Sequence, residues 1–514
     1  MKTTLNYSIF FFSLAFTSHL WSQHSSICTV ELNADKNTLT VQQELIYFNQ
    51  SNDTLQKIIL NDWNNAYSEK FSPLGNRFSD EFVRNFHLAK DDERGFTADP
   101  TFIDQNKMFL DWSRTSDHPD LIELVLRNKL LPAQKFSVFI TYKIKLPSDK
   151  FTGYGYNDKG DFMIKDWLIT PARFNEDYFA MHSNVNLDDS SNAISDYKIT
   201  FSIPKNYKLT TDLDKTIQED SKVVLTGQNR SKFSIYLQKK TDFETFILPD
   251  LTVQTNIKDN NLNGFKKALL IKQINEFITE NIGAYPHQTI VVSQTDYERN
   301  PFYGLNQLPS FISPFPDDFM FEIKFLKTYL NNFLQTSLTL DERKDNWIYS
   351  GIQVYTMMKY IDEYYPNMKM MGNISKLKIL KSFNLVNVDF NEQYSYFYML
   401  MARKNLDQPI GESKDKLIKF NEQIASKYRA GLSLNYLDRY LENKVVANSI
   451  QQFYAINKEK QTTETDFKSI LKSNTSKDIN WFFKTIIHSR DIVDYKFVDV
   501  TKTNDSITFT IKNS

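Results

Sequence analysis

The histidines decide whether this chain carries an ordinary helix-borne zinc site. Two His at positions i and i+4 lie on one face of a helix and can bind one Zn²⁺ together. The seven histidines are His19, His24, His87, His118, His182, His287 and His488. His19 and His24 are the only two that stand three to five positions apart, and both lie near the N-terminus. We therefore interpret the histidines as surface or hydrogen-bonded residues and expect no metal cofactor.

Other polar residues recur at the spacing of a two-helix site. Lys327 and Asn331 stand four positions apart in 318–335, where the apolar residues repeat with a helical period. Ser350 follows Asn331 after eighteen residues, in a second helical stretch at 346–365. The two predicted helices would therefore carry these three side chains.

These residues stand where a known peptidase family has its active site. In the M1 (gluzincin) zinc aminopeptidases, the motif HExxH is followed after eighteen residues by a Glu in a WxxEG context. Residues 301–360 resemble this region without a gap when Trp347 and Gly351 are matched. The resemblance places Lys327 and Asn331 at the two His ligands, Thr328 at the general-base Glu, and Ser350 at the third ligand.

The side chains at these positions are poorly suited to zinc chemistry. Lys327 is a cation where the metal cation would bind, and Asn331 and Ser350 are weak neutral oxygen donors. In the family, the Glu takes a proton from the zinc-bound water, whose pKa the metal lowers. Thr328 cannot act as a base near neutral pH. The sequence therefore predicts a site without metal ligands and without water activation.

A second register of the motif supplies no ligands either. Glu322 would supply the Glu of HExxH, but Phe321 and Phe325 would then replace both His. This register leaves 24 residues before Ser350, which exceeds the family spacing. The choice of register therefore does not change the prediction of a site without metal ligands.

Two further motifs resemble parts of the family's substrate site. Gly304-Leu305-Asn306-Gln307 stands where the family has G-x-M-E, whose Glu binds the free amino group of the substrate. An amide at Gln307 keeps an acceptor but loses the charge that pairs with an ammonium group. Tyr428 opens a YxxG-like helix and matches the Tyr that hydrogen-bonds the oxyanion. The resemblance thus implies substrate contacts at Gly304 and Gln307 and an oxyanion contact at Tyr428.

The surrounding pattern predicts an α+β multidomain chain. Residues 24–255 alternate in the strand manner and predict an all-β domain, in which 121–126 and 136–144 would form a hairpin. Helical spacing dominates 256–490, which resembles the family's mainly helical, thermolysin-like domain. Residues 491–514 read as the start of a C-terminal β segment. This segment either pairs with an existing sheet or belongs to a longer chain, because a single strand does not fold alone.

The N-terminal sequence bears on the cellular location of the protein, and the charge balance bears on its binding partners. Residues 1–23 predict a secretory signal peptide, with Lys2 before a short apolar run at 9–16. A secreted or periplasmic bacterial protein follows from this prediction, and no later stretch is apolar and long enough to be a transmembrane segment. Lys and Arg number 61 against 62 Asp and Glu, which gives no reason to expect nucleic acid as a partner.

Three functional hypotheses follow. The first is a catalytically inactive M1-like protein, a pseudopeptidase, whose cleft binds a peptide or a protein partner. The second is an active metallo-aminopeptidase whose metal site is not recognised, in which case zinc would be the cofactor. A Ser350–Lys327 dyad is a metal-free variant of this hypothesis, since a desolvated Lys can activate a Ser. The third is a scaffold or assembly role at the cell envelope.

Overall fold

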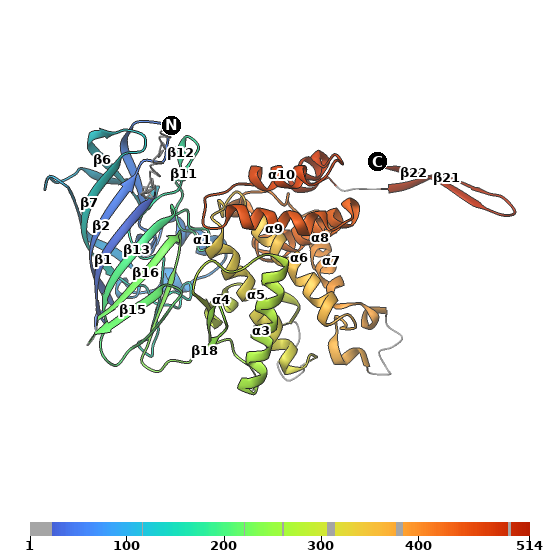
Figure 1. The fold of residues 1–514 in the computed structure, drawn as a ribbon, viewed down its shortest axis with the longest axis horizontal. Coiled ribbons are helices and arrows are strands. Elements are labelled where there is room, and N and C mark those ends of the chain that lie inside the picture. Colours follow the sequence, from blue (N-terminus) through green and yellow to red (C-terminus); the bar gives the residue numbers. More distant parts are fainter. Residues whose placement is uncertain are drawn as a thin grey trace, which may run out of the picture.

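The computed structural model describes residues 23–513, except 116, 220–221, 260–261, 306–313, 377–383 and 492–494. A β domain comes first, a helical domain packs against it, and a β-hairpin extends from the far side of the helices (Figure 1). The predicted order of an all-β region, a mainly helical region and a C-terminal β segment is therefore confirmed. The predicted signal peptide lies outside the described residues except for Gln23.

The β domain contains a large sheet and two smaller ones that share one apolar core. The large sheet has the order β15-β16-β13-β1-β2-β7-β4, and the smaller sheets are β10-β3-β6-β5 and β14-β17-β9-β8. Val41 of the large sheet, Leu124 of the second and Ile235 of the third belong to the same buried cluster. The first strands and helices are β1 His24–Asn33, β2 Thr38–Phe48, β3 Leu55–Asn61, α1 Pro73–Asp80, α2 Asn85–Leu88, β4 Phe96–Asp104, β5 Trp112–Thr115, β6 His118–Leu130 and β7 Lys135–Lys145. The domain continues with β8 Gly155–Tyr156, β9 Phe162–Lys165, β10 Thr170–Pro171, β11 Phe174–Asn175, β12 Tyr178–Phe179, β13 Ser195–Ser202, β14 Lys208–Thr211, β15 Asp214–Glu219, β16 Lys222–Arg230 and β17 Ser234–Gln238.

The predicted hairpin between 121–126 and 136–144 is wrong. Both stretches are strands, but β6 pairs with β3 and β5 while β7 pairs with β2 and β4. The chain changes sheet at Leu131–Gln134, where the amide of Ala133 donates to the carbonyl of Asn49. Two apolar strands joined by a short turn can bury their side chains against each other from opposite sheets, so local sequence does not distinguish this arrangement from a hairpin.

The helical domain begins with a small sheet and continues as packed helices. Its elements are β18 Glu244–Ile247, β19 Thr252–Thr255, α3 Gly264–Asn281, β20 Thr289–Val292, α4 Gln294–Arg299, α5 Asp317–Ser337, α6 Asn346–Tyr364, α7 Gln393–Ala402, α8 Ser426–Leu441, α9 Val445–Asn457 and α10 Glu464–Ser473. A π-helical turn at Asn421–Ala425 runs directly into α8. No helix among the described residues is long and apolar enough to cross a membrane.

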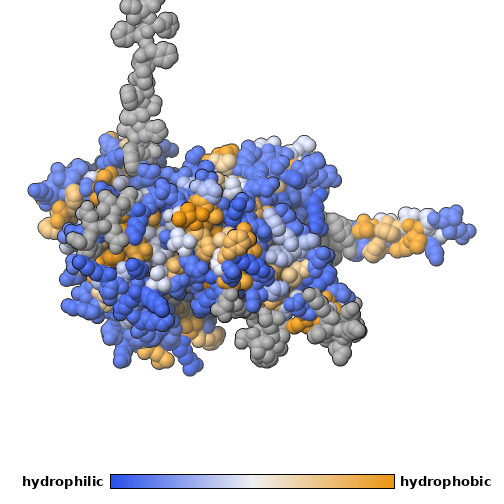
Figure 2. Space-filling view, turned by 60° about the horizontal axis from the view of Figure 1, so that its bottom comes forward, coloured by the Kyte–Doolittle hydropathy of each residue, from blue (hydrophilic) through white to orange (hydrophobic). Residues whose placement is uncertain are grey.

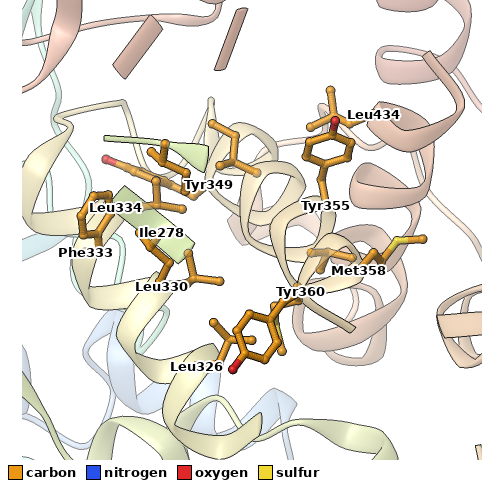
Figure 3. Close-up of a cluster of buried hydrophobic side chains, with 14 of the residues drawn as sticks. Ile278, Leu326, Leu330, Phe333, Leu334, Tyr349, Tyr355, Met358, Tyr360 and Leu434 are labelled. Atoms are coloured by element: carbon orange, nitrogen blue, oxygen red, sulfur yellow. The ribbon is translucent and has the colours of Figure 1, made fainter. Parts of the chain in front are cut away.

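Helices α5 and α6 form the centre of the helical core. Ile352, Tyr355, Met358 and Ile361 form a buried stripe on α6, and Lys359 lies over the ring of Tyr355. The buried side chains labelled in Figure 3 come from α3, α5, α6 and α8: Ile278, Leu326, Leu330, Phe333, Leu334, Tyr349, Tyr355, Met358, Tyr360 and Leu434. This packing fixes the two helices that carry the predicted site.

A buried carboxylate on α5 accepts hydrogen bonds that link this helix to α3 and α6. Glu322 of α5 is fully buried and accepts hydrogen bonds from the hydroxyls of Tyr360 and Tyr365, while Gln273 of α3 donates to it at 3.3 Å. Burial raises the pKa of Glu322, and the two tyrosine hydrogen bonds oppose this shift. Glu322 is thus a structural group inside the core, which removes it as a candidate catalytic base in the alternative register.

The C-terminal segment forms a hairpin whose apolar side chains are exposed. Strands β21 Tyr495–Lys502 and β22 Ile507–Asn513 pair with each other, and among the described residues they pair with no other strand. Phe497, Val500 and Phe509 are each more than half exposed, and the hairpin stands out from the body in Figure 2. Of the two alternatives for this segment, pairing with an existing sheet is not seen among the described residues.

Replacing Glu322 by Ala should lower the free energy of unfolding by about 2–4 kcal/mol, because the buried hydroxyl of Tyr360 and the part-buried hydroxyl of Tyr365 lose their acceptor. Urea unfolding followed by circular dichroism measures this loss. Glu322→Gln keeps one acceptor oxygen and should lose less, and Tyr365→Phe should lose less than Glu322→Ala. Equal stability of Glu322→Ala and the wild type would contradict the assigned structural role.

Candidate functional site

A polar cavity of about 210 Å³ lies where the β domain meets α5 and α6. Asn331 and Gln335 of α5 line one wall, and Asn346, Ser350 and Gln353 of α6 line the next. The remaining walls come from the β domain, α4, the π-helical turn and the start of α8. The structure therefore brings two of the predicted positions, Asn331 and Ser350, to one cavity.

Lys327 lines a much smaller pocket that adjoins this cavity. The two share Gln353, Gln423 and Lys427 as lining residues. Lys327 Nζ donates to the carbonyl of Asn300 at 2.8 Å, and Gln353 donates to the carbonyl of Lys327 at 2.8 Å. Burial, and then the charge of Lys427, lower the pKa of Lys327 well below its usual range, while Glu422 opposes this shift.

The remaining positions of the motif are engaged within helix α5. The hydroxyl of Thr328 donates to the carbonyl of Lys324 at 2.9 Å, and Thr328 lines neither pocket. The amide of Asn331 donates to Gln335 at 3.4 Å. The described residues show no hydrogen bond between Lys327 and Ser350 and thus no assembled dyad.

The residues present do not fit a zinc ion. Structural and catalytic zinc sites use Cys, His, Asp or Glu, whereas an ammonium, an amide and a hydroxyl stand at the three ligand positions. Within the part of the chain that the structure describes, no group of three His, Cys, Asp or Glu side chains is arranged to hold a metal ion. The donor set at the motif positions therefore gives no basis for a catalytic step through a metal.

The structure describes two of the three residues that the resemblance implies at the substrate site, Gly304 and Tyr428. Gly304 lies in a short helix at Tyr303–Leu305, and a Cβ there would come within 1.8 Å of Gln393 Oε1, so a larger residue would not fit without rearrangement. Gln307 lies outside the described residues. Tyr428 is buried, lines the small pocket beside Lys327 and packs edge to face on Tyr394. Burial raises the pKa of Tyr428, so its hydroxyl stays protonated and able to donate.

Arg299, at the end of α4, is a site residue that the sequence did not reveal. It lines the cavity, and its Nε and Nη2 donate at 2.9 Å to Asp188 Oδ2 and Asn186 Oδ1 of the β domain. Its third contact is the carbonyl of Thr152, and its guanidinium lies 4.4 Å from the ring centre of Tyr154. Burial alone would raise the pKa of Asp188, but Arg299 and other cations hold that pKa well below its usual range.

Three lysines complete the cationic lining. Lys165 lies 3.6 Å from Asp188, and Lys414 and Lys427 each lie 3.9 Å from Glu422. Glu422 is carried by the π-helical turn, a distortion that is frequent at functional sites. Lys427 directly precedes Tyr428 in the sequence, so its place beside a predicted site residue could have suggested that it lines the cavity. Lys165, Arg299 and Lys414 come from distant segments, and no sequence spacing relates them to the motif.

Replacing Arg299 by Met should lower the free energy of unfolding by about 3–5 kcal/mol at pH 7, because Asp188 loses its strongest partner. The pKa of Asp188 is lowered in the folded state. The contribution is therefore complete above the ordinary carboxylate pKa of about 4 and is lost as the pH falls through the lowered value. Urea unfolding at several pH values measures this effect. The exposed Arg439→Met is the matched control, and an equal effect of the two substitutions would contradict the assignment.

Comparison with solved structures reveals the same fold in M1 peptidases. An M1 zinc metallopeptidase from Deinococcus radiodurans has a TM-score of 0.54 and 11% identity, with 92% of this chain and 94% of that chain covered. Aminopeptidase A of Legionella pneumophila in complex with aspartic acid has a TM-score of 0.58 and 10% identity, with 95% of this chain and 52% of that chain covered.

Comparison of the sequence with family models finds no match, and comparison with curated proteins finds none either. The likeness to solved structures therefore concerns the fold. The chain has the two-domain fold of the M1 aminopeptidases, with a β domain followed by a helical domain.

Proposed function

We propose that this protein is an M1-like pseudopeptidase that binds peptides in the cavity between its two domains and does not hydrolyse them. The observation that carries the proposal is the chemistry at the motif positions. Lys327, Asn331 and Ser350 stand where the M1 motif has metal ligands, and Thr328 stands where it has the general base. With all four positions altered, neither a metal-bound water nor a base to activate it is available.

A cleft without this chemistry can still recognise peptides. Peptide backbones need donors and acceptors at fixed positions, and amide side chains supply both. Asn331, Gln335, Gln353 and Gln423 provide such groups around one cavity. A solved structure with the same fold, an M1 zinc metallopeptidase variant from Deinococcus radiodurans, is described as bound to the substrate Tyr-Ser-Ala (TM-score 0.55, 11% identity). Its peptide supports the choice of ligand class for this chain.

The proposal includes the location. The signal-peptide pattern at residues 1–23 supports export, and peptides outside the cytoplasm would then be the available ligands. Elemental analysis of bound zinc separates this proposal from the active metallo-aminopeptidase.

The purified protein, incubated with zinc and then dialysed, should retain much less than one zinc per chain and should not hydrolyse aminoacyl p-nitroanilides. Elemental mass spectrometry and absorbance assays measure the two outcomes. A chelator should leave the melting temperature unchanged, because no bound metal contributes to stability. Near-stoichiometric zinc with hydrolysis would overturn the proposal in favour of an active enzyme.

The register of the motif has a separate test. The combined variant Lys327→His, Thr328→Glu, Asn331→His and Ser350→Glu restores the family's donor set and should bind about one zinc per chain. A variant with the same four residue types placed at exposed positions of α3 is the matched control and should bind none. Absence of zinc in a folded quadruple variant would show that the register is wrong.

Peptide binding is tested with a defined pool, a tryptic digest of casein, passed over the immobilised protein. The wild type should retain a subset of the peptides. Ser350→Trp should retain few of them, because its side chain fills the cavity, and the exposed Ser469→Trp should behave like the wild type. The proposal would fail if the wild type and Ser350→Trp retained the same peptides.

A further inference from the structure

The cavity carries more positive than negative side chains. Lys165, Arg299, Lys414 and Lys427 line it together with the carboxylates of Asp188, Asp296 and Glu422, and Lys327 lines the adjoining pocket. The whole chain has a formal net charge of −1, so this excess is a local property. Buried cations without a paired anion are costly, which makes the excess informative.

The excess is concentrated on three lysines. Arg299 and Lys165 are accounted for by Asp188, and Asp296 accepts a hydrogen bond from Asn332 at 3.0 Å. Lys414 Nζ donates to the carbonyl of Leu187. Asp188 acts on Lys414 and Lys427 at longer range, and the carboxylate that comes within 4 Å of them, Glu422, lies 3.9 Å from both. This distance is longer than that of a direct charge-assisted hydrogen bond.

Lys427 and Lys327 also meet at one residue. Lys327 donates to the carbonyl of Asn300, and Lys427 donates to the side-chain oxygen of Asn300 at 3.4 Å. Both are bonded mainly to neutral oxygen atoms in a buried site, and burial lowers the pKa of each. A negatively charged ligand group beside them would offset this cost.

An apolar pocket of about 370 Å³ adjoins the same cavity. The two share Arg299, Asn300 and Gln423 as lining residues. Tyr303, Phe420 and Ile424 form its apolar surface, and the rings of Tyr303 and Phe420 contact each other edge to face. A ligand that reaches from one pocket to the other would therefore combine an anionic group with an apolar group.

We infer that the cavity selects peptides by a carboxylate, which lies against Lys427 and Lys414 while a neighbouring apolar side chain occupies the pocket of Tyr303, Phe420 and Ile424. This inference rests on the proposed peptide-binding function and names its ligand class. The carboxylate can come from the C-terminus of a peptide or from an acidic side chain.

Isothermal titration calorimetry with three blocked dipeptides tests the inference on the full chain. The probes are N-acetyl-Phe-Phe with a free carboxylate, its C-terminal amide, and N-acetyl-Phe-Glu amide. The free acid or the Glu peptide should bind about tenfold to a hundredfold more tightly than N-acetyl-Phe-Phe amide, the range for a hydrogen bond to a charged group. A preference for the free acid identifies the C-terminus, and a preference for the Glu peptide identifies the side chain.

Lys427→Gln should remove this preference, and Lys427→Arg should restore most of it. Lys272→Gln is the matched control, because Lys272 lies half-exposed on α3 beside Glu276. If Lys427→Gln does not fold, the salt dependence of wild-type binding decides: added salt should weaken the charged probes and leave the amide unchanged.

Two outcomes would overturn the inference. Equal affinity for all three probes would remove the carboxylate preference and leave the peptide-binding function in place. The second outcome is that none of the probes binds, while the wild type still retains casein peptides that Ser350→Trp does not. This outcome would also remove the carboxylate preference and leave the peptide-binding function in place. Failure of the pool experiment itself would overturn the proposed function.

Discussion

The contact between Arg299 and Asp188 is the constraint on which the site depends. Arg299 belongs to the helical domain, and Asp188, Asn186 and the Thr152 carbonyl belong to the β domain. One planar guanidinium thus joins two domains with separate apolar cores and also forms a wall of the cavity. The pairs Arg343–Asp189 and Lys232–Glu342 also join the two domains, and together with the Arg299 contact they hold the cavity walls in place.

Because the buried guanidinium of Arg299 joins the two domains, it also affects the charge balance of the cavity. Asp188 is in direct contact with Arg299 and Lys165, and it acts on Lys414 and Lys427 at longer range. Glu422 lies 3.9 Å from both of those lysines, Lys414 donates to the carbonyl of Leu187, and Lys327 donates to the carbonyl of Asn300. The positive excess at the centre therefore follows from how the two domains are held together, and it involves groups that the motif at 327–350 does not include.

Local periodicity in the sequence predicts the helices of the site but not the strand pairing. The helices predicted at 318–335 and 346–365 lie at Asp317–Ser337 and Asn346–Tyr364, because apolar residues repeat on their buried faces. The hairpin predicted at 121–144 is wrong because strand pairing is decided by which sheet offers a partner. Lys165, Arg299 and Lys414 escape prediction because only the folded chain brings such distant segments together.

Lys327 stands where the motif of the M1 family has its first metal ligand. In that family a divalent cation occupies the junction of the two helices, whereas here burial and the charge of Lys427 lower the pKa of the Lys327 amine. An amine has no empty coordination position and cannot lower the pKa of a bound water as a metal ion does. Under the proposed function, the cavity would attract negative groups without hydrolysing them, and the buried lysines around Glu422 would contribute to that attraction. Recognition without reaction is therefore a consistent physical outcome of these substitutions.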